Sequence, residues 1–258
     1  MPAHDLPLLI DAARMAGRVA TSFAGDAAKR WDKPDGAGPV TEADLAVNNL
    51  LHSVLRLARP DYGWLSEETE DTADRLSKDR VFIIDPIDGT RSFVEGSSTW
   101  AHSIAVAAHG RITAAVVYLP LRDKLYAAGL GMGATQNGKV ISASTESRLT
   151  NATVLAAKPA LLAQRWKANA APEFKRHYRP SLAYRLALVA EGRFDSMITL
   201  HPSWEWDIAA GALIVSEAGG TITDQNGRDL QFNNPDPRLN GVLAGGGTIH
   251  AELTDALA

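Results

Sequence analysis

The sequence predicts an α+β fold in which layers of helices and sheets pack against one another. In the first part of the chain, two segments with apolar residues at helical spacing are followed by short strand-like segments. From about residue 150 onward, helical and strand-like segments alternate. With 258 residues, 45% of them hydrophobic, the chain can bury a large core and is long enough to form two subdomains. We therefore expect an N-terminal α+β subdomain over residues 1–150 and a C-terminal α/β subdomain over residues 151–258.

The first part is predicted to hold two helices and then several short strands. Apolar residues at helical spacing support the second helix: Val47, Leu50, Leu51, Val54 and Leu55. Thr41 and Asp44 before this stripe resemble a capping box, although Glu or Gln is the usual fourth residue, so Asp44 is free for another role. The expected helices cover residues 5–24 and 42–59, and the expected strands lie near residues 81–84, 103–108, 112–119 and 125–127.

The second part is predicted to alternate strands and helices. Gly219 and Gly220 mark the end of a helix that begins near Asp207, because glycine commonly follows the last helical turn. The expected strands are residues 153–156, 194–199 and 241–244, and the other helix is residues 181–191.

The segment Asp85-Pro86-Ile87-Asp88-Gly89-Thr90 is the strongest sign of chemistry in the chain. It follows the apolar run of residues 81–84, and we expect Pro86 to end that strand because proline cannot donate to a sheet ladder. Asp85 and Asp88 are too close to stay ionised without a countercharge, which favours a hard cation. Gly89 and Thr90 can offer backbone N–H groups to an anion if a helix starts there. The alternative is a hydrogen-bonded Asx turn.

Four other acidic residues, in three places along the chain, allow a structural and a functional interpretation. Glu67 and Glu68 are adjacent, so on an extended chain only one of them can face a site, and the alternative is a solvated acidic loop. Asp207 is either the N-cap of its helix or a metal ligand. Asp44 is either a capping residue or a member of the same site.

Four motifs in order resemble those of the inositol monophosphatase superfamily, which contains magnesium-dependent, lithium-sensitive phosphomonoesterases. They are V-T-E-A-D at 40–44, L-S-E-E at 65–68, D-P-I-D-G-T at 85–90, and W-D-I-A-A-G at 206–211 with S-E-A-G-G at 216–220. The resemblance covers nearly the whole chain. It implies a layered α-β-α-β-α sandwich whose metal site lies between the two subdomains, with Asp207 supplied by the second.

The resemblance implies a two-metal Mg²⁺ site. It assigns Glu67, Asp85 and the Ile87 carbonyl to one ion, and Asp85, Asp88 and Asp207 to the other. Carboxylates and a carbonyl suit the octahedral oxygen coordination of Mg²⁺ better than they suit zinc. Two such ions clamp the attacking and leaving oxygens when metal-activated water displaces a phosphate ester.

Further catalytic and binding roles follow from the same resemblance. Asp44 and Thr90 match the pair that orients the attacking water, and Glu67 is placed with them among the catalytic residues. The amides of Gly89 and Thr90 are expected to hold phosphate oxygens. Phosphoryl transfer requires positioning and charge neutralisation more than covalent chemistry, which fits these residues.

The loop that follows Lys33 falls where the family carries a mobile flap near a third, weaker metal position. Its Gly- and Pro-rich sequence over residues 34–39 supports a loop, and an ordinary surface connection is the alternative. Relatives are often homodimers, which the sequence neither supports nor excludes.

The substrate is predicted from two departures from the inositol-specific pattern. Inositol-specific relatives have a substrate-binding Glu shortly before the W-D motif, whereas residues 196–204 here contain no acid and Glu205 is the first. Residues 181–185 resemble bacterial 3'(2'),5'-bisphosphate nucleotidases, with Arg185 and Arg91 where those enzymes carry Lys. Arg can bind a second phosphate bidentately. The alternative is that Arg185 extends over a helix surface and Arg91 pairs with a nearby acid. The preferred substrate is therefore adenosine 3',5'-bisphosphate, with inositol 1-phosphate and histidinol phosphate as alternatives.

Composition narrows the class of protein. The chain has no cysteine, which excludes disulfides and thiol catalysis, and no apolar stretch is long enough to span a bilayer. A net charge of −4 without a basic stripe argues against polymeric nucleic acid and favours a small phosphorylated metabolite in the cytoplasm. A metal-free glycosidase and a non-catalytic, metal-responsive binding protein are the rival functions. The loss of a metal ligand would mark the second, and every expected ligand is present in the sequence.

Overall fold

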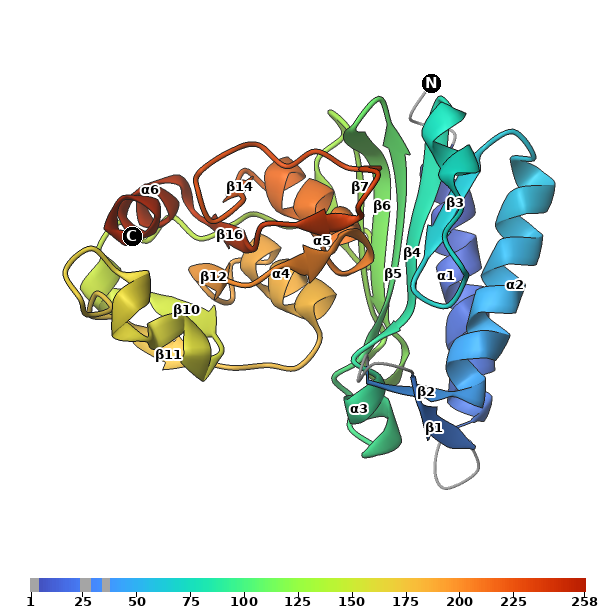
Figure 1. The fold of residues 1–258 in the computed structure, drawn as a ribbon, viewed down its shortest axis with the longest axis horizontal. Coiled ribbons are helices and arrows are strands. Elements are labelled where there is room, and N and C mark those ends of the chain that lie inside the picture. The colour runs from blue at the N-terminus through green and yellow to red at the C-terminus, as the bar shows by residue number, and fades with distance from the viewer. Residues whose placement is uncertain (1–4, 24–28, 34–37) are drawn as a thin grey trace.

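Five layers of helices and sheets make up the protein (Figure 1). The structure is a computed structural model and describes residues 5–23, 29–33 and 38–258. Two antiparallel outer helices cover one face of a seven-stranded sheet, and two central helices separate its other face from a five-stranded sheet, against which the last helix packs. These helices are α1 (Asp5–Ser22), α2 (Glu42–Ala58), α4 (Leu182–Ala190), α5 (Glu205–Glu217) and α6 (Gly247–Ala256). The predicted α-β-α-β-α sandwich is confirmed.

The seven-stranded sheet has the order β3-β4-β5-β6-β7-β8-β9 and is antiparallel except for the β3–β4 pair. Its strands are β3 (Gly63–Ser66), β4 (Arg80–Asp88), β5 (Ala101–Ala108), β6 (Arg111–Leu119), β7 (Lys124–Gly129), β8 (Ala134–Gln136) and β9 (Lys139–Val140). Along β4, Phe82 and Ile84 pack toward α1 and α2, while Val81 and Ile83 join the core that contains α4 and α5. Because both faces of this strand are covered, its sequence is a continuous apolar run.

The five-stranded sheet has the order β11-β10-β12-β16-β14. Its strands are β10 (Thr153–Ala156), β11 (Lys175–His177), β12 (Ser196–Thr199), β14 (Thr221–Thr223) and β16 (Val242–Gly245). Leu155, Met197 and Ala244 face the core around α4 and α5, whereas Ile198 and Leu243 pack with α6. The division of the chain at residue 150 stays a prediction, since one buried cluster joins Ile83 of the first sheet to Leu155 of the second.

Two small antiparallel strand pairs and a short helix complete the fold. β1 (Arg30–Asp32) pairs with β2 (Pro39–Thr41), and β13 (Ser203–Trp204) pairs with β15 (Arg238–Leu239). The short helix α3 (Thr90–Val94) follows β4 directly and lies beside the β1–β2 pair (Figure 1). Among the residues that the structure describes, none of the helices combines the length and apolar character needed to cross a bilayer.

The prediction that Pro86 ends its strand is wrong, because β4 continues through it to Asp88. The register shifts between the Asp85–Ser103 pair and the Asp88–Ala101 pair, so Pro86 and Ile87 form a bulge. A bulge residue needs no ladder N–H, which is why proline is tolerated there. The bulge bends the strand and leaves both aspartates at its buried end.

The helix predicted to begin near Asp207 starts earlier. Trp204 is the N-cap of α5, so Asp207 lies inside the first turn and the interpretation as an N-cap is wrong. Its carboxylate is free of the capping role, and a negative charge near a helix N-terminus is electrostatically favourable.

Candidate active site

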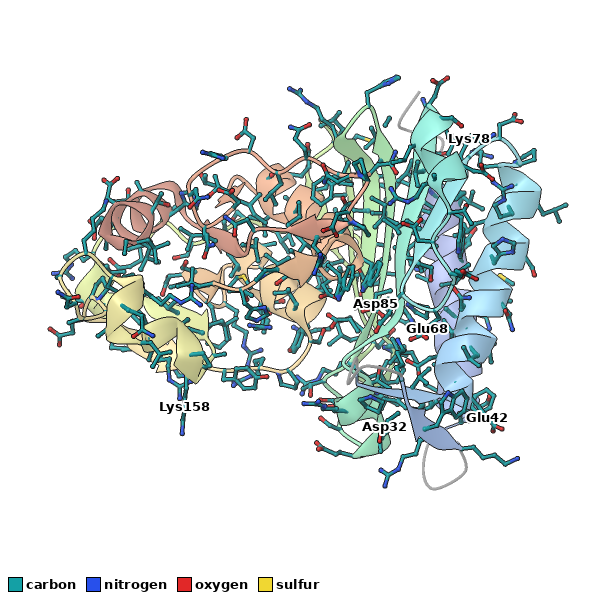
Figure 2. All side chains as sticks on the ribbon, in the orientation of Figure 1. Asp32, Glu42, Glu68, Lys78, Asp85 and Lys158 are labelled. Carbon is teal, nitrogen blue, oxygen red and sulfur yellow. The ribbon has the colours of Figure 1, made fainter. Side chains whose placement is uncertain are left out.

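Three carboxylates from distant parts of the chain meet at the end of β4. Ligand oxygens of Asp85 and Asp88 on the β4 bulge and of Asp207 on α5 lie within 4.8 Å of one another. Asp85 lies where the seven-stranded sheet meets the central helices, with Glu68 close by (Figure 2). The structure thus brings together three of the predicted metal ligands.

The electrostatics of this cluster favour a bound cation. Burial, reinforced by the charges of Glu67, Asp88 and Asp207, raises the pKa of Asp85 well above its ordinary value. Burial and the neighbouring acids likewise raise the pKa of Asp207. Oδ1 of Asp85 is buried and has no hydrogen-bond partner among the described residues. An unpartnered oxygen within a set of oxygen donors fits a hard divalent ion such as Mg²⁺.

Asp88 is fixed in place by the N-terminus of α4. Its Oδ2 accepts hydrogen bonds from Ser181 Oγ at 2.7 Å and from the backbone N–H of Ala183 at 2.6 Å. Burial raises the pKa of Asp88, while these bonds and the charge of Arg185 oppose the rise. Ser181 was missed by sequence reasoning, although a serine before an apolar helical run is an N-cap signal.

Glu67 and Glu68 share one ammonium group, and of the two only Glu67 lines the pocket over the acids, in agreement with the expectation that one of them faces the site. Lys33 Nζ lies 2.8 Å from Glu67 Oε1 and 2.6 Å from Glu68 Oε1. β3 ends at Ser66, and both acids therefore lie in a turn instead of an extended strand. Lys33 supplies a positive charge beside Glu67, and residues 34–37 of the predicted flap lie outside the described residues.

Asp44 completes the capping box and also contacts Thr90, while its catalytic role stays a prediction. Its Oδ2 accepts hydrogen bonds from the Thr41 N–H at 2.8 Å and the Thr41 hydroxyl at 2.5 Å, which completes a capping box at the start of α2. Its Oδ1 lies 3.1 Å from Thr90 Oγ1, which is also 3.2 Å from the Ile87 carbonyl oxygen. Burial raises the pKa of Asp44 despite these hydrogen bonds.

The turn from β4 into α3 lines the same pocket as the acids. Gly89 is the N-cap of α3 with φ of 100°, a conformation that only glycine adopts without strain. Thr90 is the first residue of this helix, so the condition under which its amide and that of Gly89 could bind an anion is met. The amides of Gly89 and Thr90 therefore stand next to the metal-ligand candidates Ile87 and Asp88.

A pocket of about 280 Å³ opens over the acids. Arg91 lines it on one side and Tyr178 on the other. The remaining lining residues are Gly38, Pro39, Glu67, Asp85, Ile87, Asp88, Gly89, Thr90, Ser92, Pro180, Ser181 and Asp207. The residues predicted to hold metal or the reacting phosphate all contribute to this wall, as does Arg91, whereas Arg185 does not.

Arg185 is half-buried, and its side chain packs against Tyr178 and Thr199 instead of extending over the helix surface. Its guanidinium lies 5.7 Å from the centre of the Tyr178 ring, and Nη1 is 3.4 Å from Thr199 Oγ1. Its Nε has no hydrogen-bond partner among the described residues. Burial lowers the pKa of Arg185, although Asp88 and Asp207 favour its charge. Its predicted substrate contact stays a prediction.

His102 supports the bulge from below and was not identified from the sequence. Its Nδ1 contacts the Pro86 carbonyl oxygen, so Nδ1 must carry the proton. Burial lowers the pKa of His102 to about 4, against the effect of that hydrogen bond. The neutral ring therefore holds the Pro86 carbonyl without adding charge beneath the site.

Sequence and structure comparisons place this arrangement in a known family. Residues 3–258 match the model of the inositol monophosphatase family. The chain is 32% identical to an inositol-1-monophosphatase of Mesorhizobium japonicum over 98% of this chain and 95% of that protein. It is 34% identical to the Nus factor SuhB of Escherichia coli, with 86% and 85% covered. A solved structure of a Thermotoga maritima IMPase matches with a TM-score of 0.84 at 28% identity, over 99% of this chain and 96% of that one.

A layered sandwich with clustered acids at a sheet end is shared with phosphatases that hydrolyse phosphomonoesters. The chain belongs to the inositol monophosphatase family. It is accordingly a hydrolase of the phosphoric monoester class, in a family that depends on Mg²⁺.

Proposed function

We propose that this enzyme is a Mg²⁺-dependent 3'(2'),5'-bisphosphate nucleotidase that converts adenosine 3',5'-bisphosphate into AMP and phosphate. The observation that carries the proposal is Arg91, an arginine on the wall of the pocket that also contains the acid cluster. A second phosphate on the substrate needs a cation beyond those that neutralise the reacting phosphate. Inositol 1-phosphate has no such group.

The residues proposed to hold two ions are those on the pocket wall. Glu67, Asp85 and the Ile87 carbonyl would hold one ion, and Asp85, Asp88 and Asp207 would hold the other. When bound, Mg²⁺ neutralises phosphate charge and lowers the pKa of water. The same proposal includes a third, weaker Mg²⁺ position near Lys33 and inhibition of the enzyme by lithium.

The chain's own groups handle the water and the phosphate. Thr90 Oγ1 can donate its hydrogen to Asp44 Oδ1 and present a lone pair to a water molecule. Through this hydrogen bond, the carboxylate of Asp44 can stabilise the Thr90 hydroxyl group or accept its proton. The amides of Gly89 and Thr90 at the start of α3 would bind phosphate oxygens and fix the ester for displacement.

The acid before the W-D motif supports the choice against inositol. Glu205, the first acid in that region, accepts hydrogen bonds from the backbone N–H groups of Asn233 at 2.6 Å and Asn234 at 2.9 Å. It is buried, and it does not contribute to the wall of the pocket as described. Glu205 therefore anchors the 233–234 segment and is not available to bind inositol hydroxyls.

Inositol-1-phosphate hydrolysis is the second candidate function. It is favoured by the name of the Mesorhizobium japonicum relative, which matches almost end to end. Histidinol phosphate is a third substrate to be compared. For all three, we propose a cytoplasmic enzyme that acts on a small metabolite and not on polymeric nucleic acid, with a homodimer left open.

Phosphate release from the three substrates tests this choice. The purified enzyme is incubated with Mg²⁺ and each ester, and each reaction is repeated with EDTA. We expect a chelator-sensitive preference for the bisphosphate nucleotide, and Arg91→Ala should reduce that preference. A preference for inositol 1-phosphate that Arg91→Ala leaves unchanged would overturn the substrate assignment.

A further inference from the structure

A second cavity of about 330 Å³ adjoins the active-site pocket. The two share Pro39 and Arg91 as lining residues, so they are neighbours across the first turn of α3. The other lining residues of this cavity are Arg30, Trp31, Asp32, Val94 and Glu95. Figure 2 places Asp32 of β1 beside α3, at the same end of the sheet as Asp85. Its volume is in the range of small-ligand sites.

Three side chains of this cavity have no polar or stacking partner among the described residues. The guanidinium groups of Arg30 and Arg91 make no hydrogen bond or ion pair with another residue of the described chain. Trp31 is 44% exposed on a strand whose residues are all exposed, and it stacks on no ring within the described ranges. Its exposed indole face is available to stack on the flat ring of a ligand.

We propose that this cavity is the distal half of the substrate site and binds the part of the ester that does not react. Trp31 provides a face on which an aromatic base can stack, and Arg30 and Arg91 provide cations for a second phosphate. A base and a second phosphate occur together in a nucleoside bisphosphate. The inference rests on the proposed function and adds Arg30 and Trp31 to it.

The acids of the cavity fit the same class of ligand. Asp32 and Glu95 lie on the wall with the two arginines, so the cavity is not simply a basic patch. Carboxylates accept hydrogen bonds from ribose hydroxyls or the amino group of a base. A neutral polyol would leave both guanidinium groups and the indole face without matching partners.

The specificity ratio between a nucleotide and a small ester tests the proposal. We would measure kcat/KM for adenosine 3',5'-bisphosphate and for glycerol 2-phosphate in the wild type, Trp31→Ala, Trp31→Phe and Arg30→Ala. Arg111→Ala is the matched control, because Arg111 is an exposed arginine at the opposite end of the sheet from Asp88. Binding of AMP by calorimetry provides a readout that does not depend on turnover.

We expect Trp31→Ala and Arg30→Ala each to reduce the ratio about tenfold, with AMP binding weakened to match, since base stacking and a phosphate contact are each worth that much. Trp31→Phe should recover most of the loss, and Arg111→Ala should show none. An unchanged ratio in both alanine variants would overturn the proposal. If the wild type hydrolyses glycerol 2-phosphate but neither hydrolyses nor binds the nucleotide, this inference fails while the phosphatase assignment stands. If no ester is hydrolysed, the proposed function itself fails.

Discussion

Lys33 is the residue that most changes the interpretation of the site. Its ammonium lies between Glu67, a proposed metal ligand, and Glu68, which is almost fully covered. Burial alone would lower its pKa, but the charges and hydrogen bonds of the two acids outweigh burial and raise the pKa of Lys33. Lys33 therefore neutralises the same carboxylate that a metal ion would bind.

Lys33→Met should raise the apparent affinity for Mg²⁺. Without the ammonium, an ion at Glu67 no longer competes with an ion pair, and a pair of about 1 kcal/mol corresponds to about fivefold in affinity. Titrating Mg²⁺ against the thermal unfolding midpoint measures this change. Lys29→Met is the control, because Lys29 is exposed and its only ion pair among the described residues is a long one, with Nζ 3.8 Å from Glu42 Oε1. Weaker Mg²⁺ binding in Lys33→Met would contradict the competition.

Glu68 should make the metal-free enzyme less stable as pH rises. Burial, and then the charge of Glu67, raises its pKa from 4.5 to about 7. The folded state therefore holds a proton that the unfolded state releases, and this stabilisation is present below pH 4.5 and lost as pH rises through about 7.

Glu68→Gln removes that titration. In EDTA, the unfolding midpoint of the variant should rise relative to the wild type between pH 4.5 and about 7. The contribution of His102, which has the opposite sign, cancels in this difference. Glu70→Gln, an exposed acid nearby, is the control. Parallel midpoint curves for Glu68→Gln and the wild type would refute the assignment.

Sequence patterns identified the acids of the site but not their supporting partners. Asp85, Asp88 and Asp207 could be predicted because each follows a recognisable strand or opens a helix. The contacts of Lys33 with Glu67 and of Ser181 with Asp88 could not be predicted, because they join residues that are 34 and 93 positions apart. Such pairing depends on the tertiary fold and has no local period.

At the scale of elements, the β4 bulge places the acids. Pro86 was expected to end the strand, and the ladder resumes at Asp88 because the bulge needs no donor at the proline. The Pro86 carbonyl is satisfied instead by His102 of β5. The proline correctly predicted a break in the regular pairing of β4. The sequence could not show that the neighbouring strand β5 spans this break.

His102→Phe should destabilise the enzyme by about 1–3 kcal/mol, because the buried Pro86 carbonyl loses its donor. Urea unfolding in EDTA measures the loss, and Mg²⁺ titration should show weaker binding as the bulge relaxes. His102→Asn keeps an N–H donor and should retain part of both. Equal stability of His102→Phe and the wild type would show that the contact does not hold the bulge.

At the scale of the whole molecule, the site is assembled across layers. β4 supplies Asp85 and Asp88, while the central helix α5 supplies Asp207 from more than a hundred residues away. Ser103 on β5 donates to the Trp206 carbonyl at 2.7 Å and ties α5 to the sheet next to Asp207. The layer order was predicted through family resemblance, since composition and periodicity alone gave only the α+β class.

Ser103→Ala should weaken Mg²⁺ binding as well as stability. Loss of the hydrogen bond should cost about 1 kcal/mol and loosen Asp207 relative to Asp85. Ser196→Ala is the matched control, because Ser196 makes an equivalent buried bond of 2.7 Å to the Ala244 carbonyl in the other sheet. Both variants should lose similar stability in urea, but only Ser103→Ala should bind Mg²⁺ more weakly. Equal Mg²⁺ affinities would contradict this role for Ser103.

The most direct test of the acid cluster as a metal-dependent phosphatase site is phosphate release by Asp85→Asn at saturating Mg²⁺. Asp79→Asn, an exposed acid before the opposite end of β4, is the control. We expect a loss of at least about a hundredfold for Asp85→Asn, a typical cost of removing one preorganised electrostatic group, with the unfolding midpoint in EDTA maintained or raised because a buried charge is removed. Wild-type, EDTA-sensitive turnover by Asp85→Asn would place the metal chemistry elsewhere in the protein.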